Sequence, residues 1–264
     1  MDNQPIGVFD SGIGGLTVLR EINRQLPREN LIYFGDTARV PYGNKSKETI
    51  IKFSTQNILF LLQKKVKLVV VACNTASSLA LDYIQNIFNV PIIGVIEAGV
   101  KGALRLSKRK KIGVIGTAST IKSRSYERCI SSRSPDAKVI GCSCPLFVPL
   151  AEEGIVKGPI ARQIIDFYLS KLKKQNLDSV ILGCTHYPLL KNEISRYLKP
   201  AVVIDSAKEV ARFTGHILAE RKMFSKRKTK GKIDFYVTDD ASGFSRLAKL
   251  FFQKKLPLPK IVNV

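Results

Sequence analysis

The chain has 264 residues, which is enough for two compact α/β domains or for one large domain. Its 43 lysines and arginines, against 21 aspartates and glutamates, give a formal net charge of +22. No apolar run approaches the ~18 residues of a membrane span. Residues 1–10 also lack the basic region and apolar core of a signal peptide. We therefore expect a cytoplasmic protein with no membrane partner. The odd count of five cysteines favours reduced thiols over a disulfide framework.

The positive charge is spread over the chain, with clusters at 105–111, 171–174 and 222–232. Aromatic residues are not interleaved with these clusters, as a base-stacking surface would require. A solvated basic surface is therefore the favoured interpretation, and weak attraction to a polyanion is the alternative. We do not expect a nucleic-acid partner; steeply salt-dependent retention on nucleic acid would contradict this.

In chain order, short apolar runs bounded by turn residues predict the first strands, at 6–9, 31–34, 68–72 and 91–96. Apolar residues at helical spacing predict helices between them, at 16–26, 49–64 and 77–88. A polar loop at 35–43 follows the second strand. Strands that alternate with helices favour βαβ units and largely parallel sheets.

The next section repeats this plan, with strands predicted at 111–115, 139–142, 180–183 and 202–205 and helices at 160–172 and 206–221. A basic, glycine-containing connector at 222–232 is interpreted as a mobile surface loop. The tail then has a predicted strand at 233–237, a helix at 242–252 and a last strand within 260–264. We expect this tail to pack back on the N-terminal half.

The two sections also resemble each other in sequence. Residues 6–8 and 112–114 both read Ile-Gly-Val, at an offset of 106 positions, and Cys73 and Cys184 lie 111 positions apart. Two similar α/β halves with largely parallel sheets are the simplest account. Chance similarity between short strand motifs is the alternative.

Each half carries a thiol at the end of a buried strand, in VVVACNTAS (69–77) and VILGCTHYP (180–188). A lone cysteine in such a place is usually a small core residue. Two of them, Cys73 and Cys184, in matching positions and each followed by polar residues, favour a functional pair. In open α/β sheets, ligands bind beyond the carboxyl ends of the strands, where both thiols would lie.

Two further residues could assist these thiols. Asp10 follows the first strand and could act as a base or merely cap a turn. His186 lies two positions after Cys184 and could carry a proton or only cap the next helix. A free thiol has a pKa of ~8.5, so it needs a neighbouring base or a helix N-terminus to ionise near neutral pH.

Other motifs exclude cofactor classes. Residues 10–15, DSGIGG, depart from the G-x-G-x-x-G fingerprint of dinucleotide sites, and GTAS at 116–119 lacks the lysine of a phosphate loop. Cys142 and Cys144 form C-x-C without a second pair at zinc spacing, and Cys129 falls in a predicted helix. We therefore expect no nucleotide cofactor and no metal.

Two thiols on opposite sides of one carbon suit a particular reaction. One thiolate removes a proton and the other thiol donates one from the opposite face, which inverts the centre. The carbanion formed between these steps needs fixed N–H donors to stabilise its charge. Such a pair of thiols is what a racemase or an epimerase requires. The polar groups and glycine-rich turns nearby suit a small zwitterionic ligand with a carboxylate.

The chain resembles the cofactor-independent glutamate racemases of bacterial cell-wall synthesis. The motifs that carry the resemblance are FDSGIGGLTV (9–18), GDTARVPYG (35–43), ACNTAS (72–77), IGVIGTAST (112–120), CPLFVPLAEEG (144–154) and LGCTHYPLL (182–190). The resemblance implies conversion of L-glutamate to D-glutamate for peptidoglycan, without cofactor or metal. An aspartate or hydantoin racemase would use the same two-thiol logic and stays the alternative.

The resemblance also implies roles for single residues. Cys73 would act on the D-isomer and Cys184 on the L-isomer, with assistance from Asp10, His186 and Glu152, which we take as the match in preference to the adjacent Glu153. The implied substrate contacts are Asp10, Ser11, Tyr42, Gly43, Asn74, Thr75, Thr185 and His186.

The family architecture implies two α/β domains with the active site in the cleft between them, and a homodimer. We expect residues 1–97 and 207–264 to form the first domain and residues 98–206 the second. The family pattern explains neither the basic connector nor the high charge.

Overall fold

The computed structural model describes residues 3–264, in which every predicted strand occurs. The strands are β1 Ile6–Asp10, β2 Leu31–Gly35, β3 Leu68–Val71, β4 Ile92–Gly94, β5 Lys111–Gly116, β6 Lys138–Ser143, β7 Ser179–Gly183, β8 Val202–Ile204, β9 Ile233–Val237 and β10 Lys260–Ile261. They form a six-stranded sheet, in the order β10-β9-β2-β1-β3-β4, and a four-stranded sheet, in the order β6-β5-β7-β8. All pairings are parallel.

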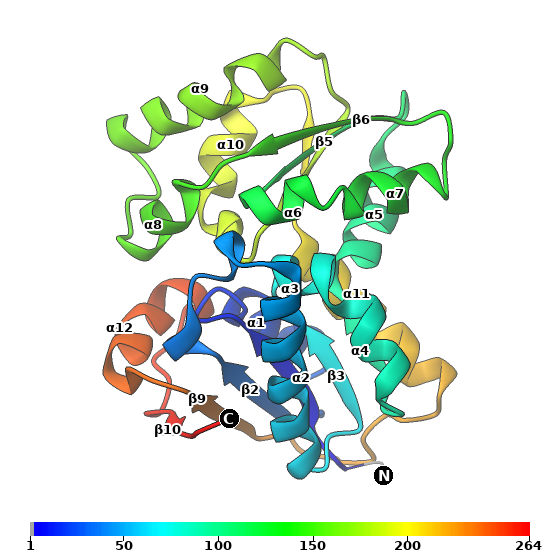
Figure 1. The fold of residues 1–264 in the computed structure, drawn as a ribbon, viewed down its shortest axis with the longest axis vertical. Coiled ribbons are helices and arrows are strands. Elements are labelled where there is room, and N and C mark those ends of the chain that lie inside the picture. Colours follow the sequence, from blue (N-terminus) through cyan, green and yellow to red (C-terminus); the bar gives the residue numbers. More distant parts are fainter. Residues whose placement is uncertain (1–2) are drawn as a thin grey trace.

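Helices connect and cover the strands. They are α1 Leu16–Gln25, α2 Lys47–Gln63, α3 Asn74–Leu79, α4 Leu81–Ile87, α5 Val95–Leu106, α6 Ala118–Lys122, α7 Ser125–Ser131, α8 Phe147–Glu152, α9 Pro159–Lys173, α10 Lys191–Tyr197, α11 Ser206–Glu220 and α12 Ala241–Phe252, with short 3₁₀ turns η1 Thr37–Arg39, η2 Tyr42–Asn44 and η3 Tyr187–Leu190. In Figure 1 the six-stranded sheet lies in the lower part of the molecule and the four-stranded sheet in the upper part.

The two sheets repeat one strand order. β2-β1-β3-β4 in the first sheet corresponds to β6-β5-β7-β8 in the second, and β9 and β10 extend the first sheet beyond β2. The prediction of two similar, parallel α/β halves is therefore confirmed. The tail packs back on the first half as expected, because β9 pairs with β2 along its whole length. The domain boundaries near residues 97 and 206 stay a prediction.

One hydrophobic cluster spans both halves, and each half also has a cluster of its own. The largest buried cluster contains Ile6 and Val8 from β1 together with Val114 from β5 and Ile181 from β7. Helix α11 connects them, since it packs against α1 on one side and α5 on the other. Burial of apolar side chains contributes roughly 25 cal/mol per Å², so this continuous cluster ties both sheets into one structure.

Two predicted boundaries were wrong. The helix predicted at 77–88 is two helices, and α3 already begins at Asn74, directly after Cys73, where the Ser77 amide donates to the Cys73 carbonyl (2.9 Å). The strand predicted at 91–96 ends at Gly94, because the Ser77 hydroxyl accepts from the Val95 amide (3.3 Å) and α5 starts there. Small polar residues thus start helices where apolar periodicity alone gives no signal.

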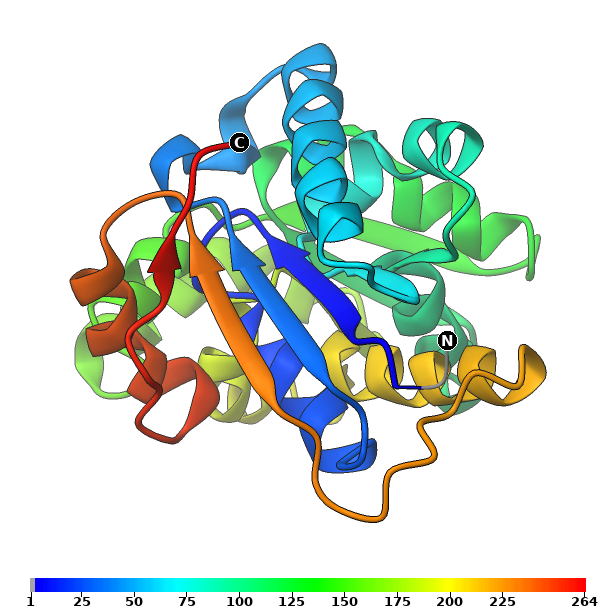
Figure 2. The ribbon, with the colours of Figure 1, turned by 90° about the horizontal axis from the view of Figure 1, so that it is seen from below.

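The basic connector at 222–232 is held against the first half, which corrects its interpretation as a mobile loop. Lys67 Nζ donates to the Met223 carbonyl (2.7 Å), and the Ser225 amide donates to a carboxylate oxygen of Glu29 (2.7 Å). The Gly231 amide donates to the Pro27 carbonyl (3.0 Å). Figure 2 shows the connector, in orange, passing from α11 to β9 beside the turn between α1 and β2.

A buried ion pair anchors this connector, and breaking it is expected to destabilise the protein. Lys67 Nζ lies 2.5 Å from Glu29 Oε2, with 0% and 2% of the two side chains exposed. Lys67→Met keeps the side-chain length but leaves the Glu29 charge unpaired, which should cost about 3–5 kcal/mol in the free energy of unfolding. Urea denaturation measures this loss in the free energy of unfolding. The exposed connector residue Lys228 gives a matched control, Lys228→Met, which should change stability by less than about 0.5 kcal/mol. Equal effects of the two substitutions would contradict the anchoring role.

Within residues 3–264, no helix combines the length and the apolar composition that crossing a membrane requires.

Candidate active site

A cavity of about 620 Å³ lies between the two halves, at the carboxyl ends of strands from both sheets. This volume is within the range of small-molecule sites, about 300–1,000 Å³. Both Cys73, which follows β3, and Cys184, which follows β7, line it. The predicted location of the site in the cleft between the halves is confirmed.

Cys73 lies at the junction of β3 and α3. Its residue is only 6% exposed. Burial raises the pKa of this thiol to about 12, and the charge of nearby Asp10 contributes in the same direction. A contact with the Ser11 side chain and one with the Ala76 amide oppose the rise. At neutral pH Cys73 is therefore a thiol that holds its proton, which suits a proton donor.

Cys184 is paired with an imidazole. Its Sγ lies 3.8 Å from His186 Nδ1, while His186 Nε2 lies 2.9 Å from Glu152 Oε1. Burial opposes the charged form of His186, but the contacts with Cys184 and Glu152 outweigh burial and raise the His186 pKa to about 10. His186 is therefore an imidazolium at neutral pH, with one N–H toward the Cys184 sulfur and the other toward Glu152.

Glu152 is the carboxylate that the geometry selects. It ends α8, lines the cavity and contacts His186, whereas the neighbouring Glu153 is the residue after the helix and is exposed. The ring of His186 also packs edge-to-face on Phe251 of α12, with centroids 5.2 Å apart. The imidazole is thus fixed on several sides.

Asp10 lies behind the cavity wall. It ends β1, is fully buried, accepts a hydrogen bond from the Gly12 amide (3.1 Å) and has Thr185 Oγ1 at 3.4 Å. Burial raises the pKa of Asp10, and the positive charge of His186 partly offsets the rise. Asp10 therefore interacts electrostatically with both walls, with Cys73 on one side and His186 on the other.

We expect Asp10→Asn to lower the pH at which Cys73 reacts with alkylating agents. The Asp10 charge helps to raise the Cys73 pKa, and asparagine keeps the size but removes the charge, so the pKa should fall toward the free-thiol value of ~8.5. The rate of iodoacetamide labelling of the tryptic peptide 68–101, followed from about pH 7 to about pH 11, measures the shift. Cys129, in a separate peptide, is the internal control. An unchanged Cys73 profile would mean that Asp10 carries no charge there.

The predicted substrate contacts fall into two groups. The residues that line the cavity are Ser11, Tyr42, Gly43, Asn74, Thr75, Thr185 and His186, and only Asp10 lies behind the wall. The Tyr42 hydroxyl has no proton left to donate to a ligand, because it donates to Asp36 Oδ2; it also accepts from Asn57 Nδ2 (3.1 Å). A hydrogen bond donated to a ligand from this position must therefore come from another part of the residue.

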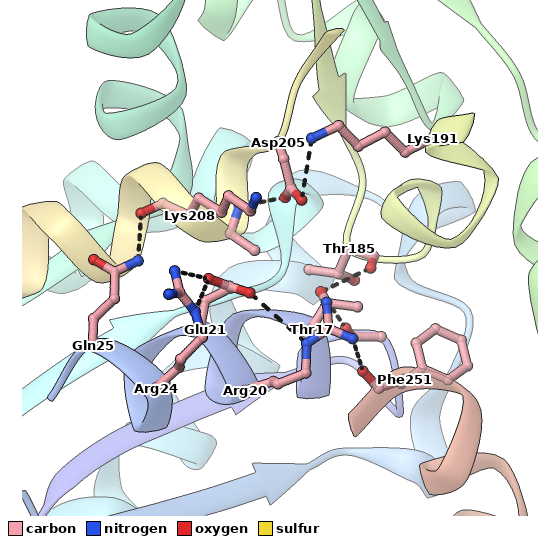
Figure 3. A network of polar contacts seen from close by, with 12 residues as sticks. Thr17, Arg20, Glu21, Arg24, Gln25, Thr185, Lys191, Asp205, Lys208 and Phe251 are labelled. Atoms are coloured by element: carbon pink, nitrogen blue, oxygen red, sulfur yellow. Dashed lines mark hydrogen bonds and ion pairs between the residues drawn. The ribbon is translucent and has the colours of Figure 1, made fainter. Parts of the chain in front are cut away.

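Polar contacts between the halves fix the two walls relative to each other. Thr75 Oγ1 lies 3.1 Å from Thr117 Oγ1, and the Ser119 hydroxyl donates to the Gly43 carbonyl (2.7 Å). On the other side, the Thr17 hydroxyl donates to the Thr185 carbonyl (3.0 Å). Figure 3 shows this last contact within a network in which α1 also reaches Lys208 of α11 and Phe251 of α12.

Some residues that line the cavity were not predicted from the sequence. Thr117 lines the cavity, and the offset of 106 that aligns the two Ile-Gly-Val strands would have aligned it with Ser11. Phe244 and Leu247 of α12 also line the cavity, but their apolar spacing carries no signal of a site. In the described part of the chain, no group of three or more His, Cys, Asp or Glu side chains could hold a metal ion.

The chain has two α/β halves, and each presents a thiol to one shared cavity. These features are typical of a two-domain α/β enzyme with a small-molecule site. Comparison with known proteins gives the family. Residues 6–214 match the family model described as Asp/Glu/Hydantoin racemase.

Curated relatives agree with the family model. The glutamate racemase of Aquifex aeolicus is 47% identical over 258 residues, which are 98% of this chain and 97% of the relative. That of Geobacter metallireducens is 45% identical over 252 residues, 95% and 93% of the two chains. The crystal structure of the Francisella tularensis glutamate racemase in complex with D-glutamate superposes with a TM-score of 0.94, at 40% identity, and covers 100% of this chain and 98% of that one. The chain belongs to the Asp/Glu/Hydantoin racemase family, and the predicted resemblance is confirmed.

Proposed function

We propose that the chain interconverts L-glutamate and D-glutamate by proton transfer through Cys73 and Cys184, and that the D-glutamate enters peptidoglycan. The observation that carries the proposal is the placement of these two thiols on one cavity, each after a strand in its own half. The names of the relatives, and the D-glutamate in the Francisella tularensis structure, support glutamate as the substrate.

The unequal surroundings of the thiols suggest how the cycle starts. Cys73 holds its proton because its pKa is raised to about 12. The His186 imidazolium places an N–H donor beside Cys184. A thiolate at Cys184 can accept a hydrogen bond from this N–H group. In this form Cys184 removes the α-proton of L-glutamate, and Cys73 donates its proton to the opposite face.

The reverse reaction starts from the protonation form in which Cys73 is the thiolate and Cys184 carries the proton. After one turnover Cys184 carries the proton and Cys73 is the thiolate, so the enzyme is then ready for D-glutamate. A proton must therefore pass between the thiols, or to water, before the same enantiomer reacts again. The high pKa of Cys73 makes its thiolate a strong base, which favours this return.

Polar groups on the cavity wall would orient the substrate. The side chains of Ser11, Asn74, Thr75 and Thr185 offer hydroxyl and amide donors to the two carboxylates. Fixed donors at the α-carboxylate would also stabilise the carbanion, because charge moves onto that group in the transition state. Tyr126 orients the Asn74 amide, since its hydroxyl donates to Asn74 Oδ1 (2.6 Å).

Circular dichroism on separate solutions of L-glutamate and L-aspartate tests the substrate. We expect the signal of L-glutamate to decay to zero as the racemate forms, with at least about 10²-fold lower kcat/KM for L-aspartate. Turnover of aspartate alone would contradict glutamate as the substrate while leaving the two-thiol mechanism open. The homodimer and the cytoplasmic location stay parts of this proposal, and analytical ultracentrifugation tests the first.

A further inference from the structure

Two thiols that the proposed reaction does not use lie side by side in the second half. Cys142 is in β6, and Cys144 follows the strand. Their Sγ atoms are 3.8 Å apart, with Cys144 as the hydrogen-bond donor. Cys142 is half-buried, Cys144 is fully buried, and both are free thiols. The two sulfurs are therefore close enough to react with each other, and small reagents can reach the half-buried Cys142.

The two thiols differ in reactivity. The hydrogen bond from Cys144 lowers the pKa of Cys142, and the same contact, together with burial, raises the pKa of Cys144. The more accessible thiol is thus the one that ionises more easily. Peroxides react with the thiolate form, and a nearby second thiol resolves the product.

We propose that Cys142 and Cys144 form a reversible oxidation site for hydroperoxides, which closes to an intramolecular disulfide. The Cys142 sulfur attacks the peroxide; its S–O bond forms, the O–O bond breaks, and a sulfenic acid and one alcohol or water result. The Cys144 thiol then attacks that sulfur, the S–S bond forms, the S–O bond breaks, and water leaves with the thiol proton. The hydroperoxide is the two-electron oxidant, and a dithiol reductant reverses the change.

The pair is connected to the candidate active site through the Cys144 carbonyl. This oxygen accepts from the Tyr187 hydroxyl (2.7 Å) and from the amide of Phe147, which begins α8 (3.1 Å). Tyr187 is the neighbour of His186, and α8 ends at Glu152. A disulfide needs the sulfurs at about 2.0 Å, so the two side chains must approach each other from their present separation of 3.8 Å. We expect this change at Cys144 to disturb the hydrogen bonds of its carbonyl, and through Tyr187 and α8 the Glu152–His186 contact, and so to lower activity.

Peptide mapping of the oxidised full chain tests the site itself. Both cysteines fall in the tryptic peptide 139–157, whereas Cys73, Cys129 and Cys184 lie in other peptides. After hydrogen peroxide, the peptide should lose about 2 Da, for two hydrogens, and should resist alkylation until dithiothreitol is added. Sulfinic or sulfonic acid at Cys142, or a cross-link from Cys144 to Cys184, would overturn the proposal.

Activity measurements test the connection to the site. Cys142→Ser removes the reacting thiol, and Cys129→Ser is the matched control, because Cys129 is also half-buried but lies in α7. Both variants should have wild-type basal activity. After peroxide, the wild type and Cys129→Ser should lose about 10-fold or more of their activity and recover it with dithiothreitol, since small displacements of catalytic groups cost this much or more. If Cys142→Ser shows the same recoverable loss, the connection is wrong.

Discussion

Replacing either Cys73 or Cys184 with serine is expected to lower kcat for racemisation of glutamate by about 10²–10⁴-fold, the usual contribution of one acid–base group. Serine has the same shape, but its hydroxyl is a much weaker acid than a thiol. Both thiols line one cavity, and in the proposed mechanism each acts once in every turnover. Circular dichroism on each enantiomer measures the loss, and Cys129→Ser should have full activity.

The two variants should differ from each other when only one base is needed. An analogue with a leaving group at the β-carbon can eliminate after a single proton removal. The Cys73→Ser variant should then process the L-analogue through Cys184, and the Cys184→Ser variant should process the D-analogue through Cys73. Equal loss with both enantiomers in both variants would argue against a separate role for each thiol.

The second large effect is expected from Gly14→Ala, far from either thiol in sequence. A Cβ at this position would lie 2.3 Å from Thr185 Oγ1 and 2.5 Å from His186 Nδ1. Both side chains would have to move, and His186 is the partner of Cys184. We expect kcat/KM to fall by about 10²-fold, the usual cost of a displacement of about 1 Å in a catalytic group. Overpacking should cost about 1–3 kcal/mol in stability as well.

Gly215→Ala is the control for this substitution. Gly215 lies within α11, and an added Cβ would meet only Leu26 Cδ2 at 3.4 Å, an ordinary contact. Alanine there should leave activity unchanged and stabilise the helix by about 0.5–1 kcal/mol. Wild-type activity of Gly14→Ala, measured beside this control at the same temperature, would show that the glycine turn does not set the position of His186.

Much of the fold could be predicted from the sequence because its signals are local. Strands such as β3 and β7 are short apolar runs between turn residues, and helices such as α1 show clear apolar spacing. The repeat of the two halves was predicted from the repeated order of strands and helices, the Ile-Gly-Val tripeptides and the matching positions of Cys73 and Cys184. The start of α3 at Asn74 could not be predicted in this way, because the residues after Cys73 are small and polar, and a tertiary contact between Ser77 and Val95 fixes the end of the next strand.

The candidate site was predictable where its residues follow strands. Cys73, Cys184 and Asp10 were placed by that rule alone, since carboxyl ends of parallel strands meet at one edge. The choice of Glu152 over Glu153 needed the structure, because only the orientation at the end of α8 decides which carboxylate reaches His186. Likewise, the part of the wall from α12 depends on how the tail folds back, which no local pattern encodes.

The continuous core described above limits how this molecule can vary. The halves look like two copies of one plan, yet neither has a complete interior: a half separated after α5 would expose Val114 and Ile181 to water. Exchange of a half between relatives, in evolution or by engineering, must therefore rematch the facing interior side chains at the same time. The same holds for the start of the connector at 222–232, because Met223 packs against this core, whereas the exposed Lys228 and Lys230 are free of that constraint.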